Sequence, residues 1–518
     1  MPTHECRIST GFRLSKKCLS WSLMCAMSVV TQTPLLAQDD SLQATAVAAL
    51  LEESFMKAVE QAEPCVVAIA TVRANRSLPR QAARNPFNLR GDGIQATNPN
   101  ADRFKPREFG TGIVVSNPKN PMERLILTNY HVVKGGKPFR ATNDISWDAT
   151  IHVWFNRHQK TEATVFAADP RSDLAVLKFD LEKLGLAPAD IPVMRLPRGN
   201  RIRKGQFVIA LGNPYAIASH DGSPSVSYGA VSNVSRFPFA ETHDDKTTIH
   251  HFGTLLHVDT RLGPGSSGGA LLNRRGELIG ITTSLAALEG YESTVGYAIP
   301  IDSSTHRIID ELIQGYEVEY GFLGVQMQQA NLRISSYGDR LRGPVGVEVN
   351  LVIEASPAEA GGVRNGDVLL AVNGKPLYEK DDVLREIGLV APGEIAHIRT
   401  FRNGREVDLK VRVGKWPVDG DGIIAAETRF PAWRGVHVDW PTARLGGFDQ
   451  EAPYPQAVYV SKVEPGSSPG QVEVGQLIVS VNSNRVETPA AFHEAVKKAG
   501  RAPVTIRLAD GQEITVRP

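Results

Sequence analysis

The sequence predicts a mainly β protein in which a long region of short strands precedes two copies of a smaller module. Between residues 110 and 300, short apolar runs alternate with turns rich in Gly, Pro, Asn and Asp. This pattern is typical of an all-β barrel or sandwich rather than of a parallel sheet. After Gly315 the sequence pattern changes, and one set of motifs then occurs twice. A chain of 518 residues is also too long for a single core, so several domains are expected.

The N-terminus has the organisation of an export signal. Basic residues precede a moderately apolar stretch at residues 18–30, and Ala37 offers a small residue at a cleavage site before Gln38. We therefore expect residues 1–37 to be removed and the mature protein to be periplasmic or otherwise exported. An uncleaved signal that tethers the protein to the membrane is the alternative. Because no apolar run is long enough for a clear spanning helix, we expect no stable membrane span after cleavage.

Composition excludes some classes of partner and bond. The chain has 57 Lys and Arg against 56 Asp and Glu. It therefore has no excess of positive charge of the kind that binds nucleic acid. Of the four cysteines, Cys65 alone lies outside the signal, so it cannot form an internal disulfide. We expect it to be a small core residue.

The region before the first repeat starts with a helix and continues as strands. The helix is predicted at residues 41–62, with Phe55 on its apolar face and Pro64 at its end. A long exposed loop is expected at residues 73–109, and a closing helix at residues 303–314. The predicted strands after this loop are 112–116, 124–128, 151–155, 163–167, 175–179, 206–211, 226–234, 255–258, 269–272, 278–283 and 296–299.

The two modules resemble each other more than they resemble the rest of the chain. Residues 355–374 run from Ala-Ser-Pro through Gly-Asp-Val-Leu to Val-Asn-Gly, and residues 463–483 run in the same order from Val-Glu-Pro through Gly-Gln-Leu-Ile to Val-Asn-Ser. Residues 416–429, rich in Gly, Asp and Pro, are the expected linker between the copies.

A glycine-rich turn, Gly263-Pro264-Gly265-Ser266-Ser267-Gly268-Gly269, is the first candidate for chemistry. Glycine is required where backbone N–H groups must converge on a small volume. Such convergence forms an oxyanion hole, which stabilises the charge that develops on an attacked carbonyl. A flexible surface loop is the alternative interpretation of this turn by itself.

Two further signals complete a serine triad. His131 follows a predicted strand, and Asp173 stands at the head of an apolar strand. Alone, the histidine could be structural and the aspartate a turn cap. Together with Ser267 they give the order His, Asp, Ser, which is the chymotrypsin order. His131 would then act as the base, Asp173 would orient the imidazole, and the N–H groups of Gly265 and Ser267 would form the oxyanion hole.

Over roughly residues 60–518, the chain resembles the HtrA/Deg family of trypsin-like serine proteases with C-terminal PDZ domains. The resemblance rests on motifs in the family's order, at residues 110–115, 127–133, 169–178, 211–215, 259–271, 276–280 and 296–300. It implies a chymotrypsin-like double β-barrel (residues 64–314), PDZ domain 1 (316–415), the linker and PDZ domain 2 (430–518), after an N-terminal helical segment (38–63). It also implies ATP-independent cleavage of unfolded or misfolded exported proteins after small aliphatic residues, no cofactor, and a homotrimer or multiples of it.

The sequence departs from the family in the nucleophile turn. The family usually has Asn where Gly263 and Ser266 stand, and often Pro where Ala270 stands. Alignment through Gly268 and Gly269 selects Ser267, not Ser266, as the nucleophile. A looser turn with a collapsed oxyanion hole at rest is one interpretation.

Two other groups of polar residues are interpreted as loop residues rather than as sites. His220 and Asp221 lie in a segment longer than usual in the family, and a surface loop is favoured over a second acid/base pair. His250 and His251, with Asp244 and Asp245, lack clear ligand spacing, so no metal is predicted.

The PDZ modules are expected to differ in peptide binding. Gly321, Phe322, Leu323 and Gly324 resemble the carboxylate-binding loop, whose N–H groups receive a C-terminal carboxylate while the peptide adds a strand. The second copy has Arg434 inside the equivalent motif, so PDZ domain 2 is expected to serve assembly. A chaperone or PDZ scaffold with weak or vestigial protease activity is the alternative function.

Overall fold

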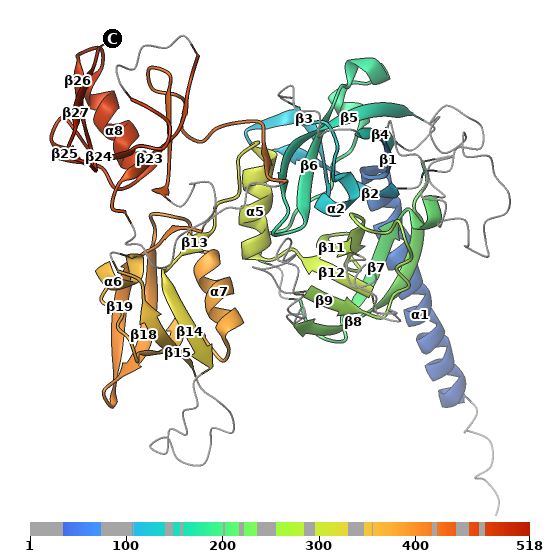
Figure 1. Ribbon diagram of the computed structural model, residues 1–518. Helices are drawn as coiled ribbons and strands as arrows, with labels where there is room; N and C mark the ends of the chain where they lie inside the picture. Colours follow the sequence, from blue (N-terminus) through green and yellow to red (C-terminus); the bar gives the residue numbers. More distant parts are fainter. Residues whose placement is uncertain are drawn as a thin grey trace, which may run out of the picture. The chain divides into compact units, whose positions relative to one another are not determined.

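The computed structural model describes most of the chain (Figure 1). The chain divides into two compact units, Met1–Glu53 and Ser54–Pro518. Residues 1–34 and most of the expected loop at residues 73–109 lie outside the described residues. Described are residues 35–73, 106, 108–139, 149–155, 159–199, 202–216, 222–235, 255–283, 296–329, 346–354, 356–416, 422–441, 455–465 and 472–517.

The N-terminal helix α1 (Leu35–Ala62) starts six residues before the predicted segment and ends where predicted. A 3-10 turn, η1 (Glu63–Cys65), follows and carries Pro64 near its start. Ala58 and Ala62 are buried in the core of the second unit, and so is Cys65, as expected. Among the described residues, no helix is both long and apolar enough to cross a membrane.

The first β-barrel is antiparallel throughout and closes on itself. Its strand order is β5-β4-β1-β2-β3-β6, and pairing of β5 with β6 completes the ring. The middle of each long strand is buried, because apolar residues face a core that is nearly inaccessible to solvent. The strands are β1 (Val66–Arg73), β2 (Glu108–Asn117), β3 (Asn120–Asn129), β4 (Ala149–Trp154), β5 (Lys160–Asp169) and β6 (Leu174–Phe179).

The second β-barrel is closed in the order β10-β11-β12-β9-β8-β7. After it, helix α5 (Ser303–Ile313) starts at Asp302, whose side chain accepts hydrogen bonds from the N–H groups of Ser304 and Thr305. The strands are β7 (Phe207–Gly212), β8 (Ser225–Ser235), β9 (Leu255–Val258), β10 (Ala270–Leu272), β11 (Leu278–Thr283) and β12 (Gly296–Pro300). The predicted double barrel is therefore confirmed, with most strands longer than the sequence indicated.

The two C-terminal modules share one topology, which confirms the predicted repeat. In the first the strand order is β14-β15-β16-β18-β19 with β17 on β16, and in the second β22-β23-β24-β26-β27 with β25 on β24. The first contains β14 (Val325–Gln329), β15 (Val347–Val352), α6 (Pro357–Ala360), β16 (Val368–Val372), β17 (Lys375–Pro376), α7 (Lys380–Gly388), β18 (Ile395–Arg402) and β19 (Arg405–Arg412). The second contains β22 (Val436–Asp439), β23 (Val458–Val463), β24 (Leu477–Val481), β25 (Asn484–Arg485), α8 (Pro489–Ala499), β26 (Val504–Leu508) and β27 (Glu513–Val516).

Short strands also form where the chain enters and leaves the first module. β13 (Gly321–Phe322) pairs with β20 (Gly414–Lys415). β21 (Ile424–Ala425) lies within the expected linker and pairs with β5 of the first barrel. The linker thus contributes a strand to the sheet of the first barrel.

Candidate active site

His131 is placed by the end of β3. Asn129 ends that strand in an extended conformation and begins the short helix α2 (Tyr130–Val133), on which His131 is the second residue. The backbone N–H of Tyr130 donates to the carbonyl oxygen of Asp173 at 3.0 Å. This bond joins the histidine turn to the turn before β6.

Asp173 faces His131 through both of its carboxylate oxygens. Nδ1 of His131 lies 3.0 Å from Oδ1 and 2.8 Å from Oδ2, and the backbone N–H of His131 also donates to Oδ1 at 3.0 Å. The carboxylate is fully buried. This arrangement fixes the imidazole with Nδ1–H towards the carboxylate and Nε2 available on the other side of the ring.

The turn that carries Asp173 is held from several directions. Asp173 has a φ of +54°, a left-handed conformation that is uncommon for a non-glycine residue. Asn129 Nδ2 donates to its carbonyl oxygen at 3.0 Å. On the other side, the buried carboxylate of Asp169 accepts bonds from Ser172 N–H at 3.2 Å and Arg171 Nε at 2.8 Å. Such a conformation persists only where its surroundings determine it.

The pair sets the protonation of the histidine. Burial of the imidazole lowers the pKa of His131, but the charge of Asp173 and its hydrogen bond more than offset this. The pKa of His131 therefore lies above the ordinary histidine value. Because only the neutral imidazole accepts a proton, His131 becomes an effective base at a higher pH than an ordinary histidine would.

The glycine-rich turn before β10 consists of two consecutive tight turns. Ser266 N–H donates to Gly263 C=O and Gly269 N–H donates to Ser266 C=O, both at 3.0 Å. Gly265 and Gly268 have φ values of +92° and +83°. Each is the third residue of its four-residue turn, where a positive φ is the mark of type II geometry.

Thr111 of β2 braces this turn, which sequence reasoning missed. Its N–H donates to Ser267 C=O at 2.8 Å, and its Oγ1 donates to Gly265 C=O at 2.8 Å. The same hydroxyl accepts the N–H of Asn213 at 2.8 Å. The barrel that carries His131 thereby fixes the loop that carries Ser267. Thr111 lies in one of the recognised motifs, but nothing in that motif indicates its partners.

Close packing excludes side chains from the turn. A Cβ on Gly268 would lie 2.0 Å from the carbonyl oxygen of Thr111, and one on Gly265 would lie 2.4 Å from the carbonyl oxygen of Asn213. Ser266 and Ser267 are themselves 5% and 2% exposed. The turn is therefore a packed and hydrogen-bonded element rather than a free surface loop.

The loop at residues 321–324 enters the first module beside an edge strand. Strand β14 has a strand partner on only one side in the described sheet. Gly324 has a φ of +83°, and its carbonyl oxygen accepts the N–H of Ile353 at 3.0 Å. The Leu323 C=O accepts the N–H of Ala358 at 2.8 Å. These bonds fix the loop at the end of a strand to which a peptide could add.

The equivalent loop of the second module contains Arg434, whose side chain bonds to other parts of the same module. The Arg434 guanidinium donates to the carbonyl oxygens of Val516 and Ala502, both at 2.8 Å, and lies 4.8 Å from the ring centre of Trp433. This arginine binds its own module. The residues His220, Asp221, Asp244, Asp245, His250 and His251 lie outside the described part of the chain.

A double barrel in which one barrel supplies a His–Asp pair and the other a braced serine turn is the arrangement of a trypsin-like peptidase. The family of trypsin-like peptidase domains matches residues 110–281, and the PDZ domain family matches residues 321–413. The chain belongs to the family of DegP-like serine endoproteases and is a serine endopeptidase.

Individual relatives extend the similarity over most of the chain. A probable periplasmic serine endoprotease DegP-like of Ectopseudomonas mendocina is 30% identical over 72% of this chain and 73% of its own length. The protein of the same description from Chlamydia muridarum is 28% identical over 97% of this chain and 94% of its own length. Among solved structures, the HtrA-type protease AlgW with a decapeptide is 26% identical with a TM-score of 0.47, covering 70% of this chain and 99% of that one.

Proposed function

We propose that His131, Asp173 and Ser267 form the catalytic triad. The observation that carries the proposal is the His131–Asp173 pair, together with the bond by which Thr111 ties the Ser267 turn to the barrel of His131. His131 accepts the proton of Ser267 Oγ as that oxygen attacks the peptide carbonyl, and then gives it to the leaving amine. Water then releases the acyl group by the reverse sequence of proton transfers.

The N–H groups of Gly265 and Ser267 form the proposed oxyanion hole. One such donor is worth roughly 3–4 kcal/mol of the barrier. The type II turn at residues 263–266 and the bond from Thr111 to the Gly265 carbonyl support a turn that is set before substrate arrives. This supports a formed rather than a collapsed resting hole.

The proposed substrates are unfolded or misfolded exported proteins, cleaved without ATP after small aliphatic residues. The support is the pairing of a serine endopeptidase with PDZ modules and the word periplasmic in the names of its relatives. The proposed location is the periplasm, after removal of residues 1–37. Residues 321–324 bind the C-terminal carboxylate of a peptide that adds to β14.

The direct test is cleavage of an unfolded protein by the mature chain and by Ser267→Ala, with the neighbouring Ser266→Ala as the matched control. We expect Ser267→Ala to lose both cleavage and labelling by a fluorophosphonate, while Ser266→Ala keeps both. Equal cleavage by Ser267→Ala and the parent would refute the triad. A parent that binds unfolded protein without being labelled would support the scaffold alternative.

The proposed assembly is a homotrimer, or a multiple of it, through an aromatic cluster. The Phe55 ring stacks on Tyr228 with 5.6 Å between ring centres and meets Phe207 edge-on at 6.0 Å. Tyr228 and Phe207 are 51% and 55% exposed, which is typical of residues that pack against a partner. Phe55→Ala should lower the mass measured by light scattering at micromolar concentration, whereas Tyr378→Ala, in the first PDZ module, should not. A parent chain that is already monomeric would refute the trimer.

A further inference from the structure

The second half of the linker lies against the catalytic barrel. In β21, Ile424 pairs with Ala168 and Ala425 with Ala167 of β5. The N–H of Ala426 donates to the Phe166 carbonyl at 3.0 Å. The side chain of Ile424 is buried in the first barrel's core cluster, which also contains Tyr130. We call residues 422–429 the linker strap.

The strap touches both turns that carry the His–Asp pair. Gly422 has a φ of +91°, and a Cβ on it would lie 2.2 Å from the Tyr130 hydroxyl oxygen and 3.1 Å from Cγ of Pro170. Tyr130 precedes His131 in α2, and Pro170 opens the turn that ends at Asp173. The backbone of Gly422 therefore lies against the side chains of Tyr130 and Pro170, one from each turn, and a Cβ there would have to displace the Tyr130 ring.

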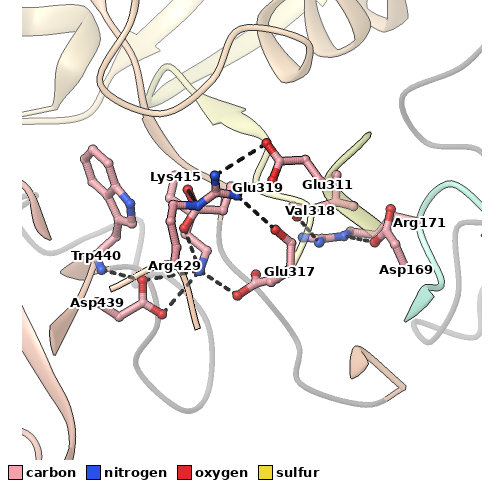
Figure 2. Close-up of polar contacts among 10 residues, drawn as sticks. All are labelled: Asp169, Arg171, Glu311, Glu317, Val318, Glu319, Lys415, Arg429, Asp439 and Trp440. Atoms are coloured by element: carbon pink, nitrogen blue, oxygen red, sulfur yellow. Dashed lines mark hydrogen bonds and ion pairs between the residues drawn. The ribbon is translucent and has the colours of Figure 1, made fainter. Parts of the chain in front are cut away.

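Ion pairs fix Lys415, which precedes the strap in the chain, and Arg429, which ends it (Figure 2). Nζ of the buried Lys415 lies 3.0 Å from Glu317, 3.6 Å from Glu319 and 3.2 Å from Asp439 of the second module. Burial lowers the pKa of Lys415, but these carboxylates more than offset it, so the ammonium stays charged. Arg429, the last strap residue, lies 2.8 Å from Glu311.

The connector between α5 and the first PDZ module, residues 314–320, contains Glu317 and Glu319 and also reaches the aspartate turn. Arg171 Nη2 donates to the Val318 carbonyl at 2.6 Å, and Arg171 Nε pairs with Asp169, as Figure 2 shows. The hydroxyl of the fully buried Tyr320 also donates to the Asp169 carboxylate. This connector is also bonded to the strap, because Arg429 Nη2 donates to the Glu317 carbonyl at 3.2 Å. It therefore joins the strap to the turn of Asp173.

We propose that the linker strap is a positioning element of the active site, with Gly422 and Ile424 as positioning residues that keep the His131 and Asp173 turns in register. This inference rests on the proposed triad. According to this proposal, the linker between the PDZ domains helps to set the turnover rate. It does so through its contact with the catalytic barrel and not by binding peptide.

The test is Gly422→Ala in the full mature chain, with Gly366→Ala as the matched control. Gly366 has a similar φ of +81°, but nothing lies within 4 Å of its Cβ position, so it reports backbone strain alone. Misplacement of a catalytic group by about 1 Å can cost on the order of 100-fold in rate. With a short unstructured peptide as substrate, we therefore expect Gly422→Ala to lower kcat at least ~10-fold. KM should stay within about twofold, because the strap contacts the His–Asp turns and no proposed peptide-binding residue.

The acid limb of the pH–rate profile gives the second readout, because displaced turns change the His131–Asp173 contact. Should Gly422→Ala fail to fold, Ile424→Ala and the conservative Ile424→Val replace it, with kcat reduced in the first and restored in the second. An unchanged kcat and acid limb in a folded Gly422→Ala or Ile424→Ala would overturn the inference. Ser267-dependent activity in the parent separates that result from failure of the triad itself.

Discussion

Replacement of Thr111 by valine should disable the enzyme from a position outside the triad. The substitution keeps the shape of the side chain but removes its hydroxyl. It therefore breaks the bonds to Gly265 C=O and Asn213 N–H, each 2.8 Å long. Thr111 is fully buried, so water cannot replace them.

The size of the effect follows from the two groups left without a partner. A buried donor or acceptor that loses its bond costs about 1–3 kcal/mol, so two cost about 2–6 kcal/mol of stability. The turn that carries the Gly265 N–H also loses the bond that fixes the Gly265 carbonyl in the following peptide unit. Loss of one oxyanion donor typically lowers kcat on the order of 100- to 1,000-fold. We expect Thr111→Val to approach the lower figure, with KM nearly unchanged.

The assay combines thermal unfolding with steady-state cleavage of a peptide substrate. Thr111→Ser retains the hydroxyl and is the matched control, with kcat close to that of the parent. If Thr111→Val were as active as Thr111→Ser, the hydroxyl would not hold the nucleophile turn. A loss of stability with full kcat would show that the brace serves folding alone.

Two further predictions concern charge. Because the pKa of His131 is raised and only the neutral imidazole accepts a proton, kcat/KM should fall on the acid side, with an inflection above that of an ordinary histidine. Asp173→Asn should move this inflection to lower pH and reduce kcat on the order of 10,000-fold, and an unmoved inflection would assign it to another group. Lys415→Met should destabilise the fold by about 3 kcal/mol, because three partly buried carboxylates lose the buried cation that they share. The exposed Lys498→Met, which breaks a pair with Glu494, should leave the melting temperature unchanged, and equal effects would contradict the role of burial.

The sequence predicted the elements better than their distant contacts. Most strands were found because turn residues separate short apolar runs, and His131 and Asp173 were found because each flanks such a run. In the structure His131 and Asp173 are hydrogen-bonded to each other, as predicted. The role of Ser267 stays a prediction. The start of α1 was placed too late, because the sequence before residue 41 has no clear apolar face.

The contacts of Thr111 and of the linker could not be predicted. Both join segments far apart in the chain, and no local pattern encodes a partner across a barrel. The linker is rich in Gly, Asp and Pro, which is typical of a loop. Its short apolar run at residues 423–426 was the available signal, but too short to distinguish a strand from a connector.

The pairing of β21 with β5 also has a consequence for the order in which the molecule is completed. Its two partners are separated by the whole second barrel and the first PDZ module. Contacts between such distant segments close the largest loops and form late in folding. If the chain becomes available for folding from the N-terminus onwards, both barrels can thus close before the strap is present. Because the strap is proposed to position the His–Asp turns, full activity would then appear only after the linker has been made.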